Sequence, residues 1–356
     1  MEFVDPAPAP VEKKKKTYKQ DWPNYNRAQT QEKALLMQLL TGLCASIGGD
    51  EPKQPGRPRI PLRDATFLAC YKVYTRSAAR RFMTDVGIAH RSGSISCEPC
   101  FNSIINVMSD PRMTDVLVDL ITTTSLPVRD LERTFAADSS GFTRSKYDRW
   151  IDIKSSALKQ QHTWTKLHLM SGVVTHIVTA VVIKGKDASD TKQFPTLLSK
   201  TAENFHIDLV YADKAYATLP NYEVCAEADV TPYIAFKSNH TGKGGRTVES
   251  RDSKGSVLWR KMFAMFQYHR DEFLANYHQR SNVETVFSMI KAKFGGEVRS
   301  KTETAALNEV LCKIVCHNIC CLISAMFVLG LDLNHLLPQR ERAPNFQLIQ
   351  GGLGGV

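Results

Sequence analysis

The sequence lacks three features that would tie a protein to a membrane or to secretion. Residues 1–10 have no apolar core of the kind that a signal peptide needs, so we expect no secretion. The most apolar run, Ile319–Leu331, is shorter than the roughly 20 residues that span a bilayer, which favours a buried helix. The nine cysteines are odd in number and show no disulfide-framework spacing. The sequence therefore predicts a cytoplasmic protein with free thiols and no membrane association.

The spacing of zinc ligands is missing as well. Cys97 and Cys100 form a lone CxxC motif, and no second pair of ligands follows at a spacing that completes a zinc site. The remaining candidates lie at helical spacing in an apolar segment: Cys312, Cys316, Cys320 and, beside them, His317. Small buried thiols explain that pattern, so we expect no zinc site.

What the chain does have is an excess of basic residues. Its 46 lysines and arginines against 36 acidic residues give a formal net charge of +10, and the isoelectric point is near 9.1. Such an excess suits a polyanionic partner such as nucleic acid, although an unrelated basic enzyme would show the same balance. The length of 356 residues allows one large domain or two ordinary ones.

We expect four regions along the chain. Residues 1–25 predict a disordered basic tail that contains four consecutive lysines, and the glycine-rich residues 331–356 predict a second disordered tail. Residues 26–130 predict an all-helical domain, and residues 131–330 predict an α/β domain. Helical spacing in the first domain covers 28–47, 63–75, 77–86, 97–108 and 112–124.

Short helices with tight joints make the first domain the expected DNA-binding domain. They permit a helix-turn-helix whose recognition helix starts near Pro99 and carries Asn102 and Asn106. A plain helical bundle would show the same periodicity, so both interpretations stand.

The linker after the first helix holds a second candidate for DNA contact. Its sequence Gly56-Arg57-Pro58-Arg59 resembles the core of minor-groove AT-hooks, in which an extended Arg-Pro-Arg lies in a narrow groove. Arg57 and Arg59 are therefore candidate DNA-binding residues, with an ordinary polar linker as the alternative.

From Thr134 the pattern changes to strands that alternate with helices. Strands are predicted at 134–137, 163–170, 173–183, 207–212 and 232–236. Helices are predicted at 191–205, 220–228, 258–273, 281–294 and 303–329. The dipeptide Ser171-Gly172 predicts a hairpin turn. This order predicts a mixed sheet flanked by helices, in which the strands 134–137 and 207–212 lie side by side and parallel.

Two aspartates follow two of these apolar strands directly. Asp138 follows the strand at 134–137, and Asp213 follows the strand at 207–212. If the strands are neighbours, both carboxylates meet at one rim of the sheet, where open α/β sheets place their sites. Taken alone, either aspartate is explained equally well as a turn or cap residue.

A third acid stands on a predicted helix with an ordered pattern of neighbours. Tyr277, Arg280, Glu284 and Lys291 have offsets of 0, 3, 7 and 14, which fall on one stripe of a helix. A second, apolar stripe lies beside it: Val283, Phe287, Ile290 and Phe294. Such a helix can bury its apolar stripe on the sheet and direct Glu284 to the sheet rim. A solvated salt-bridge face is the ordinary alternative for a glutamate between basic residues.

Three converging carboxylates match the chemistry of metal-dependent phosphoryl transfer on DNA. Two divalent metals about 4 Å apart can run this reaction, and hard cations such as Mg²⁺ choose oxygen ligands. Basic residues on the same helix stripe would grip phosphates, Arg280 bidentately and Lys291 as a point charge.

The spacing Tyr277-x2-Arg280-x3-Glu284-x6-Lys291 resembles the Tyr-Arg-Glu-Lys signature of insertion-sequence transposases of the DDE class. The segments at residues 137–142 and 211–216 resemble that family's blocks around its first and second Asp, and the resemblance spans roughly Thr17 to Leu331. It implies an RNase H-like fold, Mg²⁺ or Mn²⁺ as cofactor, and double-stranded DNA of transposon ends and target as partner. It also implies a homodimer in a synaptic complex.

By position, the resemblance makes Asp138, Asp213 and Glu284 the catalytic metal ligands. Tyr277, Arg280 and Lys291 become DNA contacts close to the metals. The expected activity is cleavage at transposon ends followed by attack of the freed 3′-OH on target DNA, in the cytoplasm and associated with the nucleoid. A DNA-binding protein derived from a transposase and a related metal-dependent nuclease are the alternatives. The short interval between Asp213 and Glu284 leaves room for only a small insertion, so hairpin chemistry on DNA ends is not implied.

Trp259 follows a basic, glycine-rich loop at 237–256 and lies upstream of Glu284. An aromatic side chain there could stack on an unpaired base. Its spacing with the apolar residues Met262, Phe263 and Phe266 favours a core position instead.

Overall fold

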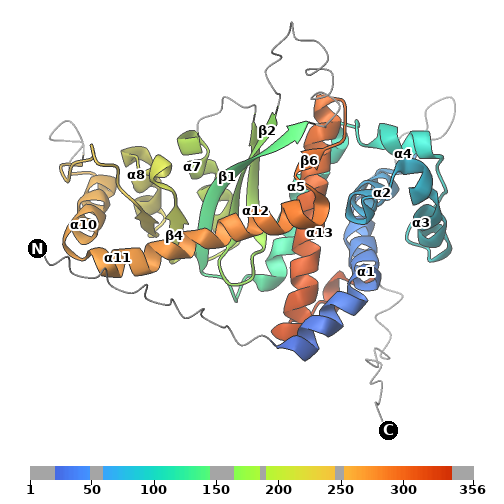
Figure 1. Ribbon diagram of the computed structural model, residues 1–356, viewed down its shortest axis with the longest axis horizontal. Coiled ribbons are helices and arrows are strands. Elements are labelled where there is room, and N and C mark those ends of the chain that lie inside the picture. Colours follow the sequence, from blue (N-terminus) through green and yellow to red (C-terminus); the bar gives the residue numbers. More distant parts are fainter. Residues whose placement is uncertain (1–20, 49–58, 145–163, 185–189, 245–251, 339–356) are drawn as a thin grey trace, which may run out of the picture.

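A computed structural model describes residues 21–48, 59–144, 164–184, 190–244 and 252–338 (Figure 1). The N-terminal part is helical, as expected: α1 (Trp22–Ala45), α2 (Leu62–Thr75), α3 (Ala79–Arg91), α4 (Phe101–Val107) and α5 (Arg112–Ser125). The side chain of Asp21 accepts from the backbone N–H of Asn24 and caps α1. Residues 22–25 are therefore helical and do not belong to a tail, and the rest of the predicted tail lies outside the described residues.

The joints between these helices differ from the expected helix-turn-helix. Only residues 76–78 separate α2 from α3, and Arg76 adopts a left-handed conformation there with φ of 55°. Residues 92–100 separate α3 from α4, which is longer than the turn of about 3–4 residues that defines the motif. The joint before the helix with Asn102 and Asn106 is therefore longer than predicted, and DNA binding by the helical part stays a prediction.

A mixed sheet forms the centre of the second part. Its strands are β1 (Thr134–Arg144), β2 (Trp164–Gly172), β3 (Val178–Lys184), β4 (Leu209–Ala212), β5 (Thr231–Ile234) and β6 (Glu297–Val298). The order is β3-β2-β1-β4-β5, and β6 pairs with β1. The pairs β1–β2 and β2–β3 are antiparallel, whereas β1–β4, β4–β5 and β1–β6 are parallel. The predicted α/β class, with a mixed sheet flanked by helices after a helical N-terminal region, is confirmed.

Two details of the predicted strands are wrong. The strand at 134–137 continues to Arg144, because the polar residues that follow Ala137 pair with β2 from Leu169 to Trp164. The predicted turn at Ser171-Gly172 lies inside β2, and the chain turns at residues 173–177, where His176 has φ of 60°. Pairing with a neighbour, which a sequence pattern does not reveal, sets both boundaries.

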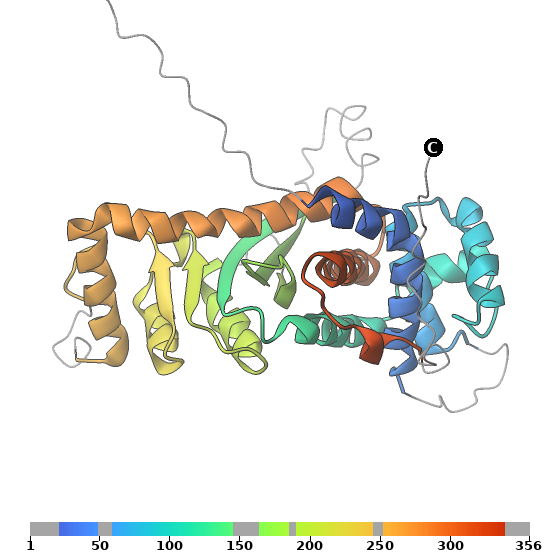
Figure 2. The ribbon, with the colours of Figure 1, turned by 90° about the horizontal axis from the view of Figure 1, so that it is seen from below.

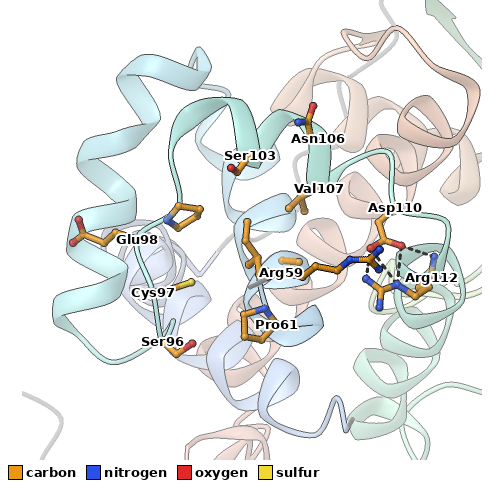
Figure 3. A pocket seen from close by; sticks show the side chains of 13 residues that line it. Arg59, Pro61, Ser96, Cys97, Glu98, Ser103, Asn106, Val107, Asp110 and Arg112 are labelled. Atoms are coloured by element: carbon orange, nitrogen blue, oxygen red, sulfur yellow. Dashed lines mark hydrogen bonds and ion pairs between the residues drawn. The ribbon is translucent and has the colours of Figure 1, made fainter. Parts of the chain in front are cut away.

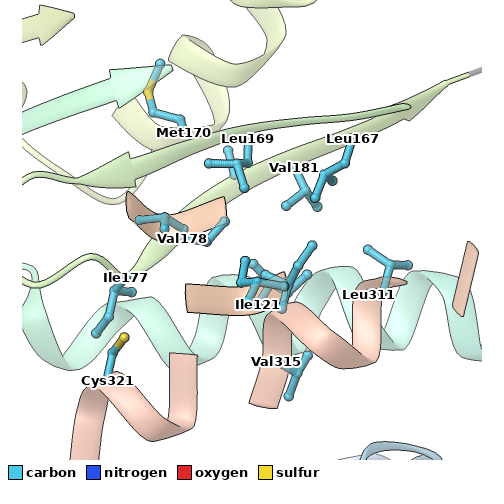
Figure 4. Close-up of a cluster of buried hydrophobic side chains, with 14 of the residues drawn as sticks. Ile121, Leu167, Leu169, Met170, Ile177, Val178, Val181, Leu311, Val315 and Cys321 are labelled. Carbon is cyan, nitrogen blue, oxygen red and sulfur yellow. The ribbon is translucent and has the colours of Figure 1, made fainter. Parts of the chain in front are cut away.

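Helices cover the sheet on both faces (Figure 2). The helices of this part are α7 (Phe194–Ala202), α8 (Leu219–Glu227), α10 (Lys254–Tyr268), α11 (Arg270–Tyr277), α12 (Ser281–Phe294) and α13 (Glu303–Val328). Of these, α10 packs mainly on α8 and α11 rather than on the sheet. Helix α12 packs on β1 and β2, and α7 packs on β2 and β3. Leu167 and Leu169 of β2 face Ile121 of α5 and Leu311 of α13 across the core (Figure 4).

Helix α13 joins the two parts of the molecule. It contacts α1, α2 and α5 as well as β3 and β6. By length and composition alone it could cross a membrane, but 78% of its most apolar window is buried inside the protein, as in the core helix of a globular fold. Its buried Asn318 exchanges hydrogen bonds of 2.9 and 2.8 Å with the backbone N–H and C=O of Val178 on β3, and donates to Thr124 Oγ1 on α5 at 3.0 Å.

The chain after α13 packs back on α1. Leu333 and Leu337 are buried, and a Cβ atom added to Gly42 would lie 1.8 Å from the carbonyl oxygen of Leu336. The tail predicted from residue 331 is therefore ordered as far as residue 338, and its remainder lies outside the described residues.

Candidate active site at the rim of the sheet

The two aspartates sit beside each other on parallel strands. The register of β1 and β4 pairs Ala137 with Ala212, so Asp138 and Asp213 occupy the next position along each strand. Asp138 lies within β1 and pairs with Leu169 on its other side, whereas Asp213 follows β4 directly and begins a 3-10 turn. The predicted parallel pairing of the two strands is confirmed.

The third acid reaches the same rim from a helical run formed by α11, the 3-10 turn His278–Arg280 (η4) and α12. The predicted apolar stripe of α12 is buried: Val283, Phe287, Ile290 and Phe294. The turn η4 contacts both β1 and β4, which places Arg280 over the two strands that carry the aspartates. Glu284, one turn further, keeps a side chain that is 54% exposed. The expected placement of this helix is therefore confirmed.

Arg280 lies between two of the three carboxylates. Its Nη1 atom is 2.7 Å from Oε1 of Glu284 and 4.0 Å from Oδ2 of Asp138. Burial raises the pKa of Asp138, against the opposing effect of the backbone N–H of Ser139 and of Arg280, and the charges of Asp213 and Glu284 raise it further. The three acids thus act on one another electrostatically, and the guanidinium compensates part of their charge.

Tyr277 and Lys291 flank this group on the same side. The ring of Tyr277 lies 5.8 Å from the guanidinium carbon of Arg280. Burial raises the pKa of Tyr277, and the charges of Asp213 and Glu284 add to the increase. At the other end, Lys291 Nζ donates to Ser140 Oγ at 2.6 Å. The stripe predicted from the sequence therefore comes together around the rim.

Ser140 and Phe142 are site residues that the sequence patterns did not single out. Side chains two apart on a strand share a face, so Asp138, Ser140 and Phe142 point to the same side of β1. The Phe142 ring is buried and lies 5.4 Å from Lys291 Nζ. The signal that could have found them is this alternation, which shows only when the strand is known to extend past Asp138.

The donor set suits a hard divalent cation, since it consists of carboxylate oxygens. Within the ranges that the structure describes, no three His, Cys, Asp or Glu side chains lie close enough together to hold one ion. Arg280 lies between Asp138 and Glu284, with its Nη1 atom within 4.0 Å of a carboxylate oxygen of each.

Of the two arginines in the linker, only Arg59 is among the described residues, and it does not join this group. Arg57 lies outside the described residues. Arg59 lines a separate cavity of about 680 Å³ in the helical part, where it points toward Asp110 and Arg112 (Figure 3). Arg112 holds Asp110 in a close ion pair of 2.6 Å. Together with a smaller contribution from Arg59, this pair lowers the pKa of Asp110.

Trp259 and two of the helix-face cysteines, Cys312 and Cys316, are buried in the core. Trp259 is 7% exposed, packs edge-on against Phe236 and Tyr222, and donates from Nε1 to the carbonyl of Thr241 at 2.9 Å. This confirms its core interpretation. The three helix-face cysteines are free thiols, two of them buried, as expected.

Comparison with known families identifies the chain. Residues 129–319, more than half of its length, match the family described as "Transposase DDE domain". The chain belongs to this family. The range that matches the DDE transposase domain leaves the helices α1 to α5 outside. It contains all six residues predicted for the rim: Asp138, Asp213, Tyr277, Arg280, Glu284 and Lys291.

A solved structure of the piggyBac transposase synaptic complex with hairpin DNA is also similar, with 10% sequence identity and a TM-score of 0.38. The similarity covers 92% of this chain and 82% of that chain. At this score the assignment to the DDE transposases rests on the family match. A search of curated proteins gives no match.

Proposed function

We propose that this DDE transposase cuts double-stranded DNA at the ends of a mobile element and joins the freed 3′-OH to target DNA. One observation carries the proposal: Asp138, Asp213 and Glu284 reach the same rim of the sheet from two parallel strands and a helix. The family match and the basic net charge support DNA as the substrate.

In this proposal the three carboxylates hold Mg²⁺ or Mn²⁺. When bound, such ions activate the attacking oxygen and stabilise the leaving one. Arg280 then leaves Glu284 and donates to a phosphate, which a guanidinium binds bidentately. Lys291, held by Ser140, supplies a second positive charge toward the DNA backbone, and Tyr277 keeps Arg280 in place through its ring. Tyr277, Arg280, Glu284 and Lys291 match the Tyr-Arg-Glu-Lys signature by their spacing in the sequence.

Two ends must be brought together before an element can move as a unit, so we propose a homodimer that holds one end in each subunit. We place this activity in the cytoplasm, in association with the nucleoid, where the element's DNA lies.

The test uses a supercoiled plasmid that carries the gene with its native flanking DNA. Purified protein with Mg²⁺ should cut at the element ends and join them to new DNA, and Asp213→Asn should abolish both steps while it leaves DNA binding intact. The matched control is Asp208→Asn, because Asp208 precedes β4 at the opposite end of the same strand and the charge change is equal. Its activity should stay near that of the wild type.

Each other outcome supports a different function. Cleavage without joining would make the protein a nuclease. Binding without cleavage, unchanged in Asp213→Asn, would make it a DNA-binding protein derived from a transposase and would reject the enzymatic proposal.

A further inference from the structure

A second charged feature opens where the N-terminal helices meet α12 and α13. It is a cavity of about 540 Å³, walled by the end of α2, by α4, by the end of α12 and by the first turns of α13. Five basic residues line it, and we call them the basic cleft: Lys72, Arg76, Arg299, Lys301 and Lys313. None of them belongs to the stripe that carries Glu284.

The positive charge of the basic cleft is poorly compensated. Glu309 is the one acidic residue that lines it. Its carboxylate already accepts hydrogen bonds from the backbone N–H groups of Arg299 and Ser300 and from the Ser300 hydroxyl, at 2.7 to 3.1 Å, and lies 3.8 Å from Lys313 Nζ.

The remaining cations of the cleft have no carboxylate partner. The guanidinium groups of Arg76 and Arg299 donate to the neutral carbonyls of Lys293 and Arg76, at 3.5 and 3.0 Å. Across the described ranges of the chain, no ion pair involves Lys72, Arg76, Arg299 or Lys301. The cleft therefore carries a net excess of cations that an anion from outside the chain would balance.

The basic groups also act on one another. Burial lowers the pKa of Lys313 to about 8, against the opposing effect of Glu309, and the charges of Arg299 and Arg76 lower it further. Burial likewise lowers the pKa of Lys72, against the opposing effect of Glu309, and the charge of Arg299 lowers it further. Cations that disfavour one another's charged form become more stable when a phosphate binds between them.

The basic cleft lies near the acidic rim, the edge of the sheet that carries Asp138, Asp213 and Glu284, and the two share a contact through Phe142. Lys313 Nζ lies 5.4 Å from the ring of Phe142, and Lys291 Nζ lies at the same distance from that ring. Phe142 stands four residues after Asp138 on the same face of β1, a span of about 13 Å at roughly 3.3 Å per residue. That length corresponds to about four base-pair steps at roughly 3.4 Å each. Phe142 and Lys313 are themselves buried, so these contacts give the separation of the cleft from the rim, which a DNA strand would span along the surface of the protein.

We propose that the basic cleft binds the phosphodiester backbone of the DNA strand whose scissile bond lies at the acidic rim, a few nucleotides away from that bond. The proposal rests on the proposed function, since it takes the rim as the place of cleavage. Its ligand is a chain phosphate and carries no base information, so the cleft contributes affinity and register in a sequence-independent manner.

The test compares two double variants of the full chain. Lys72→Gln/Lys301→Gln removes two charges of the cleft that make no ion pair. Lys192→Gln/Lys200→Gln removes the same number of charges from two exposed positions, Lys192 just before α7 and Lys200 within it. Binding to a fluorescein-labelled duplex of arbitrary sequence is measured by anisotropy over a range of salt concentrations. The slope of log K against log salt should fall by about 1.8 in the cleft variant, at about 0.9 per lost phosphate contact, and should stay unchanged in the control.

An equal slope in wild type and cleft variant, with both folded by circular dichroism, would overturn the proposal. A second measurement follows the melting temperature with inorganic pyrophosphate. If pyrophosphate stabilises the wild type and not the cleft variant, while the DNA slope is unchanged, the cleft is a small-anion site and the proposal for DNA is wrong.

A separate result would show that the proposed cleavage function, rather than the cleft proposal, is wrong. Asp213→Asn that still cleaves DNA would reject the proposed function whatever the salt slopes show. Loss of cleavage in Asp213→Asn together with unchanged slopes in the cleft variant would reject the cleft alone.

Discussion

Replacement of Arg280 should change metal affinity and DNA cleavage in opposite directions. The guanidinium lies 2.7 Å from Glu284 and 4.0 Å from Asp138, so a divalent cation between these carboxylates has a positive charge as its neighbour. A double and a single charge about 4 Å apart repel by about 2 kcal/mol in water, and physiological salt reduces this to about 1 kcal/mol. Arg280→Gln should therefore bind the metal about fivefold more tightly, at 1.36 kcal/mol for each factor of ten.

The assay counts free Mn²⁺ by electron paramagnetic resonance as the protein is titrated without DNA. Cleavage by the same variant should fall, because the phosphate loses its bidentate donor. Arg81→Gln, an exposed position on α3, serves as the matched control and should change neither quantity. Mn²⁺ binding by Arg280→Gln that is equal to or weaker than that of the wild type would refute the reasoning, since Arg280 would then not compete with the metal.

Three further predictions concern the core, the chain end and the acids. Asn318→Leu should lower the free energy of unfolding in urea by about 2–6 kcal/mol, because the backbone N–H and C=O of Val178 lose their buried partners at about 1–3 kcal/mol each; a loss below about 1 kcal/mol would contradict this. Gly42→Ala should lower the melting temperature, since the new Cβ would meet the Leu336 carbonyl, whereas Gly48→Ala meets no atom within 4 Å and should not; equal melting temperatures would show that residues 333–337 do not hold this position. Burial raises the pKa of Asp138, and only the deprotonated form binds a cation, so Mn²⁺ affinity should begin to fall on acidification above the ordinary aspartate range near about 3.9; an affinity that stays constant down to that range would be the opposite result.

Much of the rim could be predicted because its signals lie within single strands and helices. An acid after an apolar strand and a polar stripe beside an apolar stripe are periodic signals, and both survived in the structure. Pairing was the one long-range assumption, and the register of β1 with β4 confirmed it. The extent of β1 beyond Asp138 could not be predicted, because its polar residues are held in a strand by β2 rather than by their own preference.

The basic cleft escaped prediction for a different reason. Lys72 and Arg76 belong to the N-terminal helices, whereas Arg299, Lys301 and Lys313 lie more than two hundred positions later. No periodicity connects residues so far apart, and only the packing of α13 against α2 brings them together. The same packing joins the regions predicted at 26–130 and 131–330, because α13 contributes side chains to the core of both.

The place of α13 has a consequence for how the protein is made. A ribosome releases the N-terminal helices first, yet the apolar faces of α1, α2 and α5 have their main partner in a helix that ends at Val328. Their surfaces stay open to solvent and to chaperones until α13 has been synthesised. The first part to emerge is therefore among the last to reach its final packing, and a chain that stops before α13 would leave both parts without their common core.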